Sequence, residues 1–273
     1  MTDEEIYEVA RRMRCGIIES THAAKSGHPG GSLGCAEIVA YLYFEEMNID
    51  PERPDWPQRD RFVLSKGHCA PTLYAALAER GYFPREELLS LRKVGSRLQG
   101  HPNMSTLPGV DMSTGSLGQG VSTAVGMALA SRQWNDGFRV YCLLGDGEIE
   151  EGQVWEAAMF AGNLGLDNLV LIVDYNDMQI DGLLSEVNSP EPIADKFRAF
   201  NFHVIEVEDG NDLSQLRPAF AEARATKGIP TCIVAKTLKG KGVSYMEGKV
   251  EWHGKAPNDE QYELAMAELE RDE

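Results

Sequence analysis

The second half of the chain alternates amphipathic helical patterns with short apolar runs. Each predicted helix precedes a run rich in Val, Ile and Leu, and the four helix–strand pairs are 120–134 with 139–144, 152–164 with 168–174, 193–200 with 203–207, and 212–226 with 230–235. Apolar strands that alternate with amphipathic helices are typical of a parallel sheet covered on both faces. We therefore predict an α/β fold with a parallel sheet and helices on both faces.

The first half mixes helices with irregular segments. A helix is expected over 3–26, with Ile6, Val9, Met13, Ile17 and Ile18 on one face. Further helices are expected over 35–47, 70–80 and 84–91, a strand over 61–65, and a last helix over 258–271. The segment SGHPGGSLG (26–34) holds four glycines and a proline, so it is predicted to be neither helix nor strand. The patterns contain no repeat and no convincing linker, and residues 1–273 are interpreted as a single domain.

The long irregular stretches are candidates for function. Residues 92–119 lack a regular pattern, and a loop of that length inside a compact domain is usually functional. Residues 236–257 are also irregular. Several of the motifs considered below fall within these two stretches.

Charge and composition exclude some classes of function. The chain has 26 Lys and Arg against 43 Asp and Glu, a net charge of −17, so it lacks the basic surface that nucleic-acid binding or an anionic membrane requires. No apolar run approaches the ~20 residues of a membrane-spanning helix, and the N-terminus is acidic where a signal peptide is basic. The five cysteines form no CxxC pair. Reduced thiols and a cytoplasmic location are therefore expected.

The strongest chemical signal is GDGEIEEGQVWEA (145–157), directly after the predicted strand 139–144. A second polar turn, from Asp174, follows the next strand. Because parallel strands end at one edge of the sheet, Asp146 and Asn176 are expected to meet there and to suit a cation such as Mg²⁺. The alternative is an ordinary acidic turn. An EF-hand is excluded, because Glu151 and Ala157 stand where that loop needs Gly and Glu.

Two other glycine-rich segments do not fit known phosphate-binding motifs. GSLGQG (115–120) lacks the dinucleotide-binding spacing and follows no clear strand, and KGKG (239–242) lacks the P-loop spacing. Loops that open helices still offer backbone N–H groups to an anion, and the segment STGSLGQG (113–120) is the best placed of them.

Four of the six histidines lie in turns rich in Gly or Pro. These are His28, His68, His101 and His253. Their spacing matches no zinc signature, and imidazoles gathered around one reaction centre can donate hydrogen bonds and move protons. A proton-transfer cluster is therefore favoured over a metal site. Glu151 and Glu156 have a simpler alternative, as solvated acids near a helix start.

Together these motifs resemble the thiamine-diphosphate-binding part of transketolase. GHPGGSLG, SKGHCAP, GHP, STGSLGQG, GDGEIEEGQVWEA, VDYNDMQIDG, KGKGVSYME and WHG occur in transketolase order, from about residue 6 to residue 257. The resemblance implies the thiamin diphosphate-binding fold, in its diphosphate domain, with thiamine diphosphate and Mg²⁺ (or Ca²⁺) as cofactors. Deoxyxylulose-phosphate synthases and oxoacid dehydrogenase E1 components share the GDG motif but fit the histidine turns less well. A silent assembly module is a third alternative.

The resemblance also assigns roles to residues. The metal ligands would be Asp146, Asn176 and the backbone carbonyl of Met178. The cofactor would contact His68, Gly115, Ser116, Leu117, Asp146, Gly147, Glu148, Asn176 and His253. The catalytic residues would be His28, His68, His101, His253, Glu151 and Glu156. Of the two glutamates, Glu151 resembles the acid that pairs with a partner's activating glutamate.

Partners are expected on the same ground. Single-chain transketolases continue into pyrimidine-binding and C-terminal domains, whereas this sequence stops after the diphosphate-binding part. The resemblance therefore implies the N-terminal subunit of a split transketolase, paired with a C-terminal subunit that carries the pyrimidine domain and an activating glutamate, in a heterotetramer. Sugar phosphates are the expected substrates, and the pentose phosphate pathway is the default role.

Overall fold

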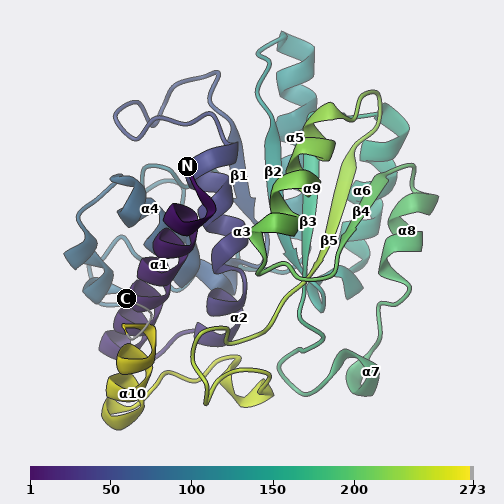
Figure 1. Ribbon diagram of the computed structural model, residues 1–273. Coiled ribbons are helices and arrows are strands. Elements are labelled where there is room, and N and C mark those ends of the chain that lie inside the picture. The colour runs from purple at the N-terminus through teal and green to yellow at the C-terminus, as the bar shows by residue number, and fades with distance from the viewer. Residues whose placement is uncertain (271–273) are drawn as a thin grey trace.

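The computed structural model describes residues 1–270, and a five-stranded parallel sheet lies at its centre (Figure 1). The strands are β1 (Arg61–Leu64), β2 (Val140–Gly145), β3 (Leu169–Tyr175), β4 (His203–Val207) and β5 (Thr231–Lys236). Their order across the sheet is β1-β2-β3-β5-β4, and every neighbouring pair is parallel. The predicted strands and the parallel sheet are confirmed.

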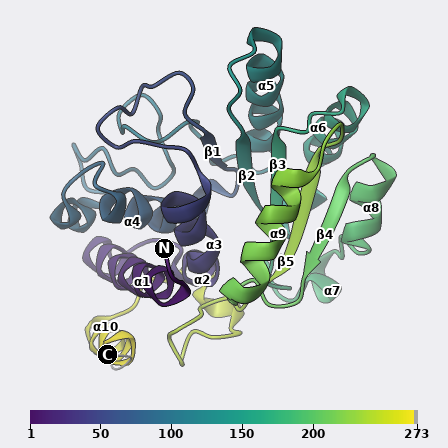
Figure 2. The same cartoon turned by 45° about the horizontal axis from the view of Figure 1, so that its top comes forward.

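Helices cover both faces of this sheet, as predicted (Figures 1 and 2). One face is covered by α1 (Asp3–Ala24), α3 (Ala36–Tyr41), α4 (Ala70–Arg80) and α9 (Leu213–Ala225), with α10 (Asp259–Leu269) packed beside α1. The other face is covered by α5 (Gln119–Trp134), α6 (Gly152–Leu164) and α8 (Ile193–Ala199).

The strand sequences explain the two cores. Side chains alternate across a strand, so Tyr141 and Leu143 pack into the core with α1 and α9, while Cys142 and Leu144 pack into the core with α5 and α6. All four side chains are buried. A strand buried on both faces needs a continuous apolar run rather than an alternating one, which is what residues 140–144 provide.

The expectation that SGHPGGSLG is neither helix nor strand is wrong. Pro29–Gly34 forms the short helix α2, with Pro29 at its first turn, where proline's fixed φ suits a helix. Its glycines serve close packing: a Cβ on Gly30 would lie 2.7 Å from the carbonyl oxygen of Trp252, and one on Gly31 would lie 2.9 Å from the Cys69 sulfur. The helical conformation of this segment is therefore set by tertiary contacts, which the periodicity of the sequence does not show.

Smaller differences concern element ends. The helix expected over 35–47 divides into α3 and a π-helical turn, Leu42–Glu46, and the one expected over 84–91 is the 3₁₀ helix Arg85–Ser90. A short helix, α7 (Leu184–Val187), was not predicted. The last helix ends at Leu269, and position 271 of the expected helix lies outside the described residues.

Segments from distant parts of the chain meet at the carboxyl edge of the sheet. In the register of β2 and β3, Gly145 pairs with Asp174, so the two polar turns begin side by side. The 3₁₀ turn Gly67–Cys69 follows β1 at the same edge, and Thr114 donates its hydroxyl to the carbonyl of Leu64 there (2.7 Å). The edge therefore gathers the glycine-rich and polar motifs of the sequence.

Two further expectations concern the chain as a whole. The five cysteines are free thiols, as predicted, and all five are buried. Among residues 1–270, no helix has the length and apolar character needed to cross a membrane.

Candidate active site

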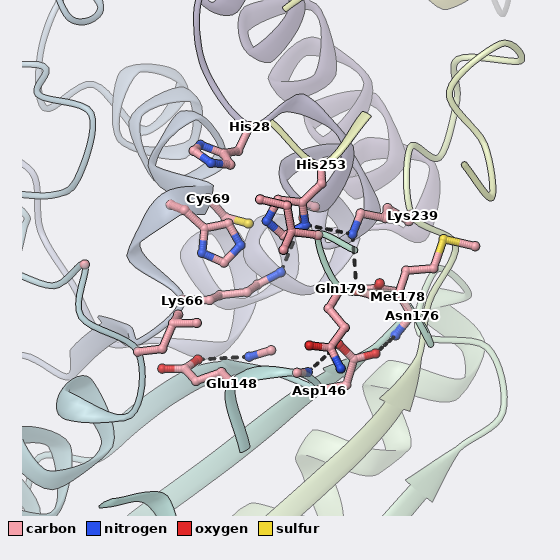
Figure 3. A pocket seen from close by; sticks show the side chains of 17 residues that line it. His28, Lys66, Cys69, Asp146, Glu148, Asn176, Met178, Gln179, Lys239 and His253 are labelled. Atoms are coloured by element: carbon pink, nitrogen blue, oxygen red, sulfur yellow. Dashed lines mark hydrogen bonds between the residues drawn. The ribbon is translucent and has the colours of Figure 1, made fainter. Parts of the chain in front are cut away.

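A pocket of about 310 Å³ opens at this edge of the sheet (Figure 3). The predicted site residues that line it are His28, His68, Gly115, Leu117, Asp146, Gly147, Glu148, Asn176, Met178 and His253. Figure 3 shows His28 and His253 on one side and Asp146, Asn176 and Glu148 near the strand ends opposite them. The fold thus brings together residues that are up to 225 positions apart in the sequence, from His28 to His253.

Asp146 joins the two polar turns directly. One carboxylate oxygen of Asp146 accepts the Gly147 N–H (2.8 Å), and the other accepts the N–H groups of Asn176 (2.8 Å) and Asp177 (2.6 Å). The expected meeting of Asp146 with Asn176 is therefore present in the structure. Because these bonds hold the carboxylate at the sheet edge, its position is fixed without a ligand.

The Asn176 side chain offers a free oxygen at the same place. Its amide nitrogen donates to Asp174 (3.3 Å), whereas its buried Oδ1 has no hydrogen-bond partner among the described residues. An unpaired buried oxygen beside a carboxylate suits a hard cation. No group of three or more His, Cys, Asp or Glu side chains within residues 1–270 forms a metal site. The donor set therefore fits Mg²⁺ that takes its remaining ligands from a diphosphate and water.

The Asp146 carboxyl has a perturbed pKa. Burial, followed by the neighbouring Asp174 carboxylate, raises its pKa from 3.8 to about 7. Between these two values the folded chain keeps a proton that the unfolded chain has lost. The contribution of this group to stability is therefore full below pH 3.8 and is lost as the pH rises to about 7.

This pKa predicts pH-dependent metal binding. Mg²⁺ must displace the Asp146 proton, so the Mg²⁺ affinity in the presence of thiamine diphosphate should fall about tenfold for each pH unit below the pKa and level off above it. Calorimetric titration at several pH values checks this. The pocket imidazoles do not overlap with this window, since their pKa values lie near 4 and 3. An affinity that is independent of pH on both sides of 7 would contradict the assignment of Asp146.

Glu148 lines the pocket and connects three segments. Its buried carboxylate accepts the Ser65 hydroxyl (2.5 Å), the Gly118 N–H (2.9 Å) and the Gly145 N–H (3.0 Å). Burial raises its pKa, although these three donors oppose that effect. Glu148 therefore holds the ends of β1 and β2 and the start of α5 together, a role the sequence alone did not show.

Three imidazoles pack against one another in the pocket. The ring centroids of His28 and His68 are 5.2 Å apart, those of His28 and His253 5.6 Å, and those of His68 and His253 5.1 Å. Burial lowers the pKa of His28 and His68 to about 4 and that of His253 to about 3, with nearby positive charges adding to the effect. All three rings are neutral at physiological pH, so they can donate or accept hydrogen bonds.

Two lysines in the pocket were missed by the sequence analysis. Lys66 is buried against Asp174: burial lowers its pKa, but this carboxylate outweighs burial and raises it well above the usual value. Lys239 donates to the carbonyl oxygen of Met178 (3.2 Å) and to Nδ1 of His253 (3.0 Å). Lys66 belongs to the motif SKGH and Lys239 to the segment KGKG, so their positions beside glycines could have indicated a role. The sequence analysis considered only the glycines and the histidine of these segments.

Four predicted residues do not line the pocket. His101 is exposed, but its ring lies beside the pocket wall, since a Cβ on Gly115 would come within 3.1 Å of it. Ser116 is exposed on the same loop. Glu151 and Glu156 are exposed at the start of α6, as their simpler alternative allowed.

The approach of Gly67 to the pocket wall gives a test of the cofactor pocket. A Cβ on Gly67 would lie 2.6 Å from Thr114 Oγ1 and 2.8 Å from the Gly115 nitrogen. Overpacking of this kind typically costs about 1–3 kcal/mol, so Gly67→Ala should weaken thiamine diphosphate binding about tenfold by displacing the 114–118 segment. Fluorescence titration with the cofactor measures this.

The matched control is Gly126→Ala on α5. Nothing lies within 4 Å of a Cβ at Gly126, and this residue is exposed inside a helix. The control should keep its cofactor affinity and gain up to about 1 kcal/mol of stability. Equal cofactor affinities for Gly67→Ala and the unmodified chain would show that Gly67 does not set the pocket wall.

The fold and pocket together define a thiamine-diphosphate-binding domain, and comparisons with known proteins agree. The family described as "Transketolase, thiamine diphosphate binding domain" matches residues 6–271. The chain belongs to this family, so the resemblance noted from its motifs is confirmed.

Two relatives have nearly the same length as this chain. A protein of a Clostridium species named as a 6-deoxy-6-sulfo-D-fructose transketolase subunit is 50% identical over 90% of this chain and 89% of its own length. A protein of Phocaeicola vulgatus named as an apulose-4-phosphate transketolase subunit is 42% identical over 98% of this chain and 95% of its own length.

Longer transketolases match over part of their length. Human transketolase is 45% identical over 92% of this chain but only 40% of its own length. The solved transketolase from Leishmania mexicana superposes with a TM-score of 0.93 at 39% identity, over 99% of this chain and 42% of that one. The chain thus spans about two fifths of these transketolases.

Proposed function

We propose that this chain is the N-terminal subunit of a two-subunit transketolase, which moves a two-carbon ketol unit from a ketose donor to an aldose acceptor. The observation that carries the proposal is the convergence of Asp146, the unpaired Asn176 oxygen and three neutral imidazoles on one pocket. Two relatives of matching length are named as transketolase subunits, which supports a partner chain.

The chain's own residues would hold the cofactors. Asp146, Asn176 and the Met178 carbonyl would bind Mg²⁺ (or Ca²⁺). Lys239 lines the same pocket and lies beside the Met178 carbonyl, so its positive charge would face a diphosphate bound to the metal. Gly147, Gly115 and Leu117 line the pocket wall and would contact the cofactor, while the Gly147 N–H donates to Asp146. When bound, thiamine diphosphate supplies the electron sink that breaking a carbon–carbon bond requires.

The imidazoles would then act on the sugar. Because His28, His68 and His253 are neutral, each can bond a hydroxyl or accept a proton as the ketol unit moves. His101, just outside the pocket, would bond the hydroxyls of the donor sugar. A Cβ on Gly118 would lie 2.9 Å from the Cβ of Glu151, and Glu151 is proposed to face the partner's glutamate. Glu156 follows five residues later on α6 and would join the same acidic network, and Ser116, two residues before Gly118, would contact the cofactor.

The substrate and setting belong to the same proposal. A sugar phosphate is the expected class, and the relatives' names add a sulfonated sugar and apulose 4-phosphate to the donors worth testing. A heterotetramer, a cytoplasmic location and a role in the pentose phosphate pathway stay predictions.

A donor screen tests the proposal. The chain is mixed with a candidate C-terminal subunit, thiamine diphosphate, Mg²⁺ and an aldose phosphate as acceptor. The aldose released from the donor and the new ketose formed from the acceptor are measured, with ketose phosphates and 6-deoxy-6-sulfofructose as donors. Ketol transfer that needs both chains is the expected result. Cofactor-dependent oxidation or decarboxylation of an oxoacid, without ketol transfer, would reject it.

A further inference from the structure

Arg92 is held in place beside the pocket. It lies in the loop between the 3₁₀ helix Arg85–Ser90 and His101, with φ of +59°, and its N–H donates to the Leu98 carbonyl (2.8 Å). Its guanidinium donates to the Ser26 hydroxyl (2.8 Å). A Cβ on Gly100 would lie 3.0 Å from its Nε, so the guanidinium packs against bare backbone. These contacts fix the direction of the side chain.

The guanidinium also reaches His28. Its Nη2 lies 3.4 Å from His28 Nδ1. A guanidinium can only donate, so Nδ1 of His28 must accept and the ring proton of the neutral form must sit on Nε2. Within residues 1–270, no carboxylate forms an ion pair with Arg92, so its charge acts on His28 without a counter-ion. After burial and His68, Arg92 is the next cause that lowers the pKa of His28.

The Nε2 edge of the His28 ring, opposite Arg92, is available to bond a ligand. Nε2 has no hydrogen-bond partner among the described residues, and a Cβ on Gly254 would come no closer than 3.6 Å to this edge. The groups that face His28 from other elements are His68, His101, His253 and Lys239, none of which is an acid. His253 shows the same pattern independently, because Lys239 lies 3.0 Å from its Nδ1.

We propose that Arg92 is a positioning residue, which holds His28 as the Nε2–H tautomer so that this ring presents a hydrogen-bond donor to the substrate. The inference rests on the proposed function for its catalytic meaning, but the tautomer itself is a property of this chain. An acceptor nitrogen at the same position would attract a hydroxyl proton instead of stabilising a substrate oxygen. Arg92 therefore acts through His28 and need not touch the sugar.

Imidazole NMR tests the tautomer directly. Long-range ¹H–¹⁵N correlations of the labelled full-length chain, with His28 assigned from the spectrum of His28→Asn, should show an unprotonated Nδ1. In Arg92→Met, the protonated nitrogen should become mixed between Nδ1 and Nε2, and the pKa of His28 should rise by about one unit, as expected when a close positive charge is removed. Arg92→Lys, which keeps a cation, should shift less.

Arg97→Met is the matched control. Arg97 lies in the same loop but pairs with Glu87 (2.6 Å), so the Arg97→Met substitution should leave the His28 spectrum unchanged.

Kinetics of the complex give a second test. With the partner present, Arg92→Met should lower kcat about tenfold or more, while cofactor affinity stays the same. A large rise in KM at constant kcat would instead show direct substrate binding by Arg92 and overturn the proposal.

The NMR test of the tautomer and the activity test of the proposed function can fail independently of each other. A protonated Nδ1 in the unmodified chain, or a His28 spectrum and titration unchanged in Arg92→Met, would overturn the inference even if the complex transfers ketol units. Conversely, the absence of ketol transfer would reject the function but leave the NMR result in place.

Discussion

Replacing Asp146 by alanine is expected to abolish metal-dependent binding of thiamine diphosphate while the fold is kept. This carboxylate accepts three backbone N–H groups and lies beside the unpaired oxygen of Asn176, so its loss removes the charged part of the metal site. Loss of an outer partner of a metal ligand typically costs 10–100-fold, so loss of the ligand itself should weaken binding by more than about 100-fold. Calorimetric titration of thiamine diphosphate with Mg²⁺ measures this loss.

Asp181→Ala is the control for this experiment. Asp181 is exposed in the loop that follows Met178, and it does not line the pocket. This variant should bind the cofactor as the unmodified chain does. Circular dichroism of both variants shows whether the fold is kept. Unchanged cofactor affinity in a folded Asp146→Ala chain would remove the basis for the metal site.

The isolated chain is expected to be inactive, and addition of the C-terminal subunit is expected to restore ketol transfer. The two carboxylates that line the described pocket, Asp146 and Glu148, are both engaged by hydrogen-bond donors. Neither is free to activate the cofactor, a task that the resemblance gives to a glutamate on the pyrimidine domain. General acid–base catalysis typically contributes about 10²–10⁴-fold, so the chain alone should be at least about 100-fold slower than the mixture.

The reconstitution needs three controls. The partner alone should be inactive, the mixture with Asp146→Ala should be inactive, and the mixture with Asp181→Ala should be fully active. Activity should rise with added partner until the two chains reach equal molar amounts. Full activity from this chain without any partner would refute the two-subunit assignment.

The sequence predicted what depends on local pattern. Continuous apolar runs such as Val140–Gly145 gave the buried strands, and the position of Gly145 and Asp174 at strand ends was enough to place Asp146 beside Asn176. The sequence analysis grouped four histidine turns. His28, His68 and His253 line the pocket, whereas His101 lies beside its wall, and their catalytic roles stay predictions.

What the sequence could not show depends on contacts between distant segments. The glycines of α2 looked like a loop because their need for close packing against Trp252 and Cys69 exists only in the fold. The sequence analysis gave no role to Lys66 and Lys239, since burial of Lys66 becomes acceptable only with Asp174 beside it. The strand order β3-β5-β4 likewise follows from packing and leaves no local signal.

The hydrogen bonds of the Glu148 carboxylate affect how rigid the pocket is before a ligand binds. Because it fastens the ends of two strands and the turn before α5 to one another, these backbone segments have little freedom left to lose on binding. A ligand should therefore meet a surface already in its final shape, and amide hydrogens at Gly118 and Gly145 should exchange slowly with solvent before any cofactor is added.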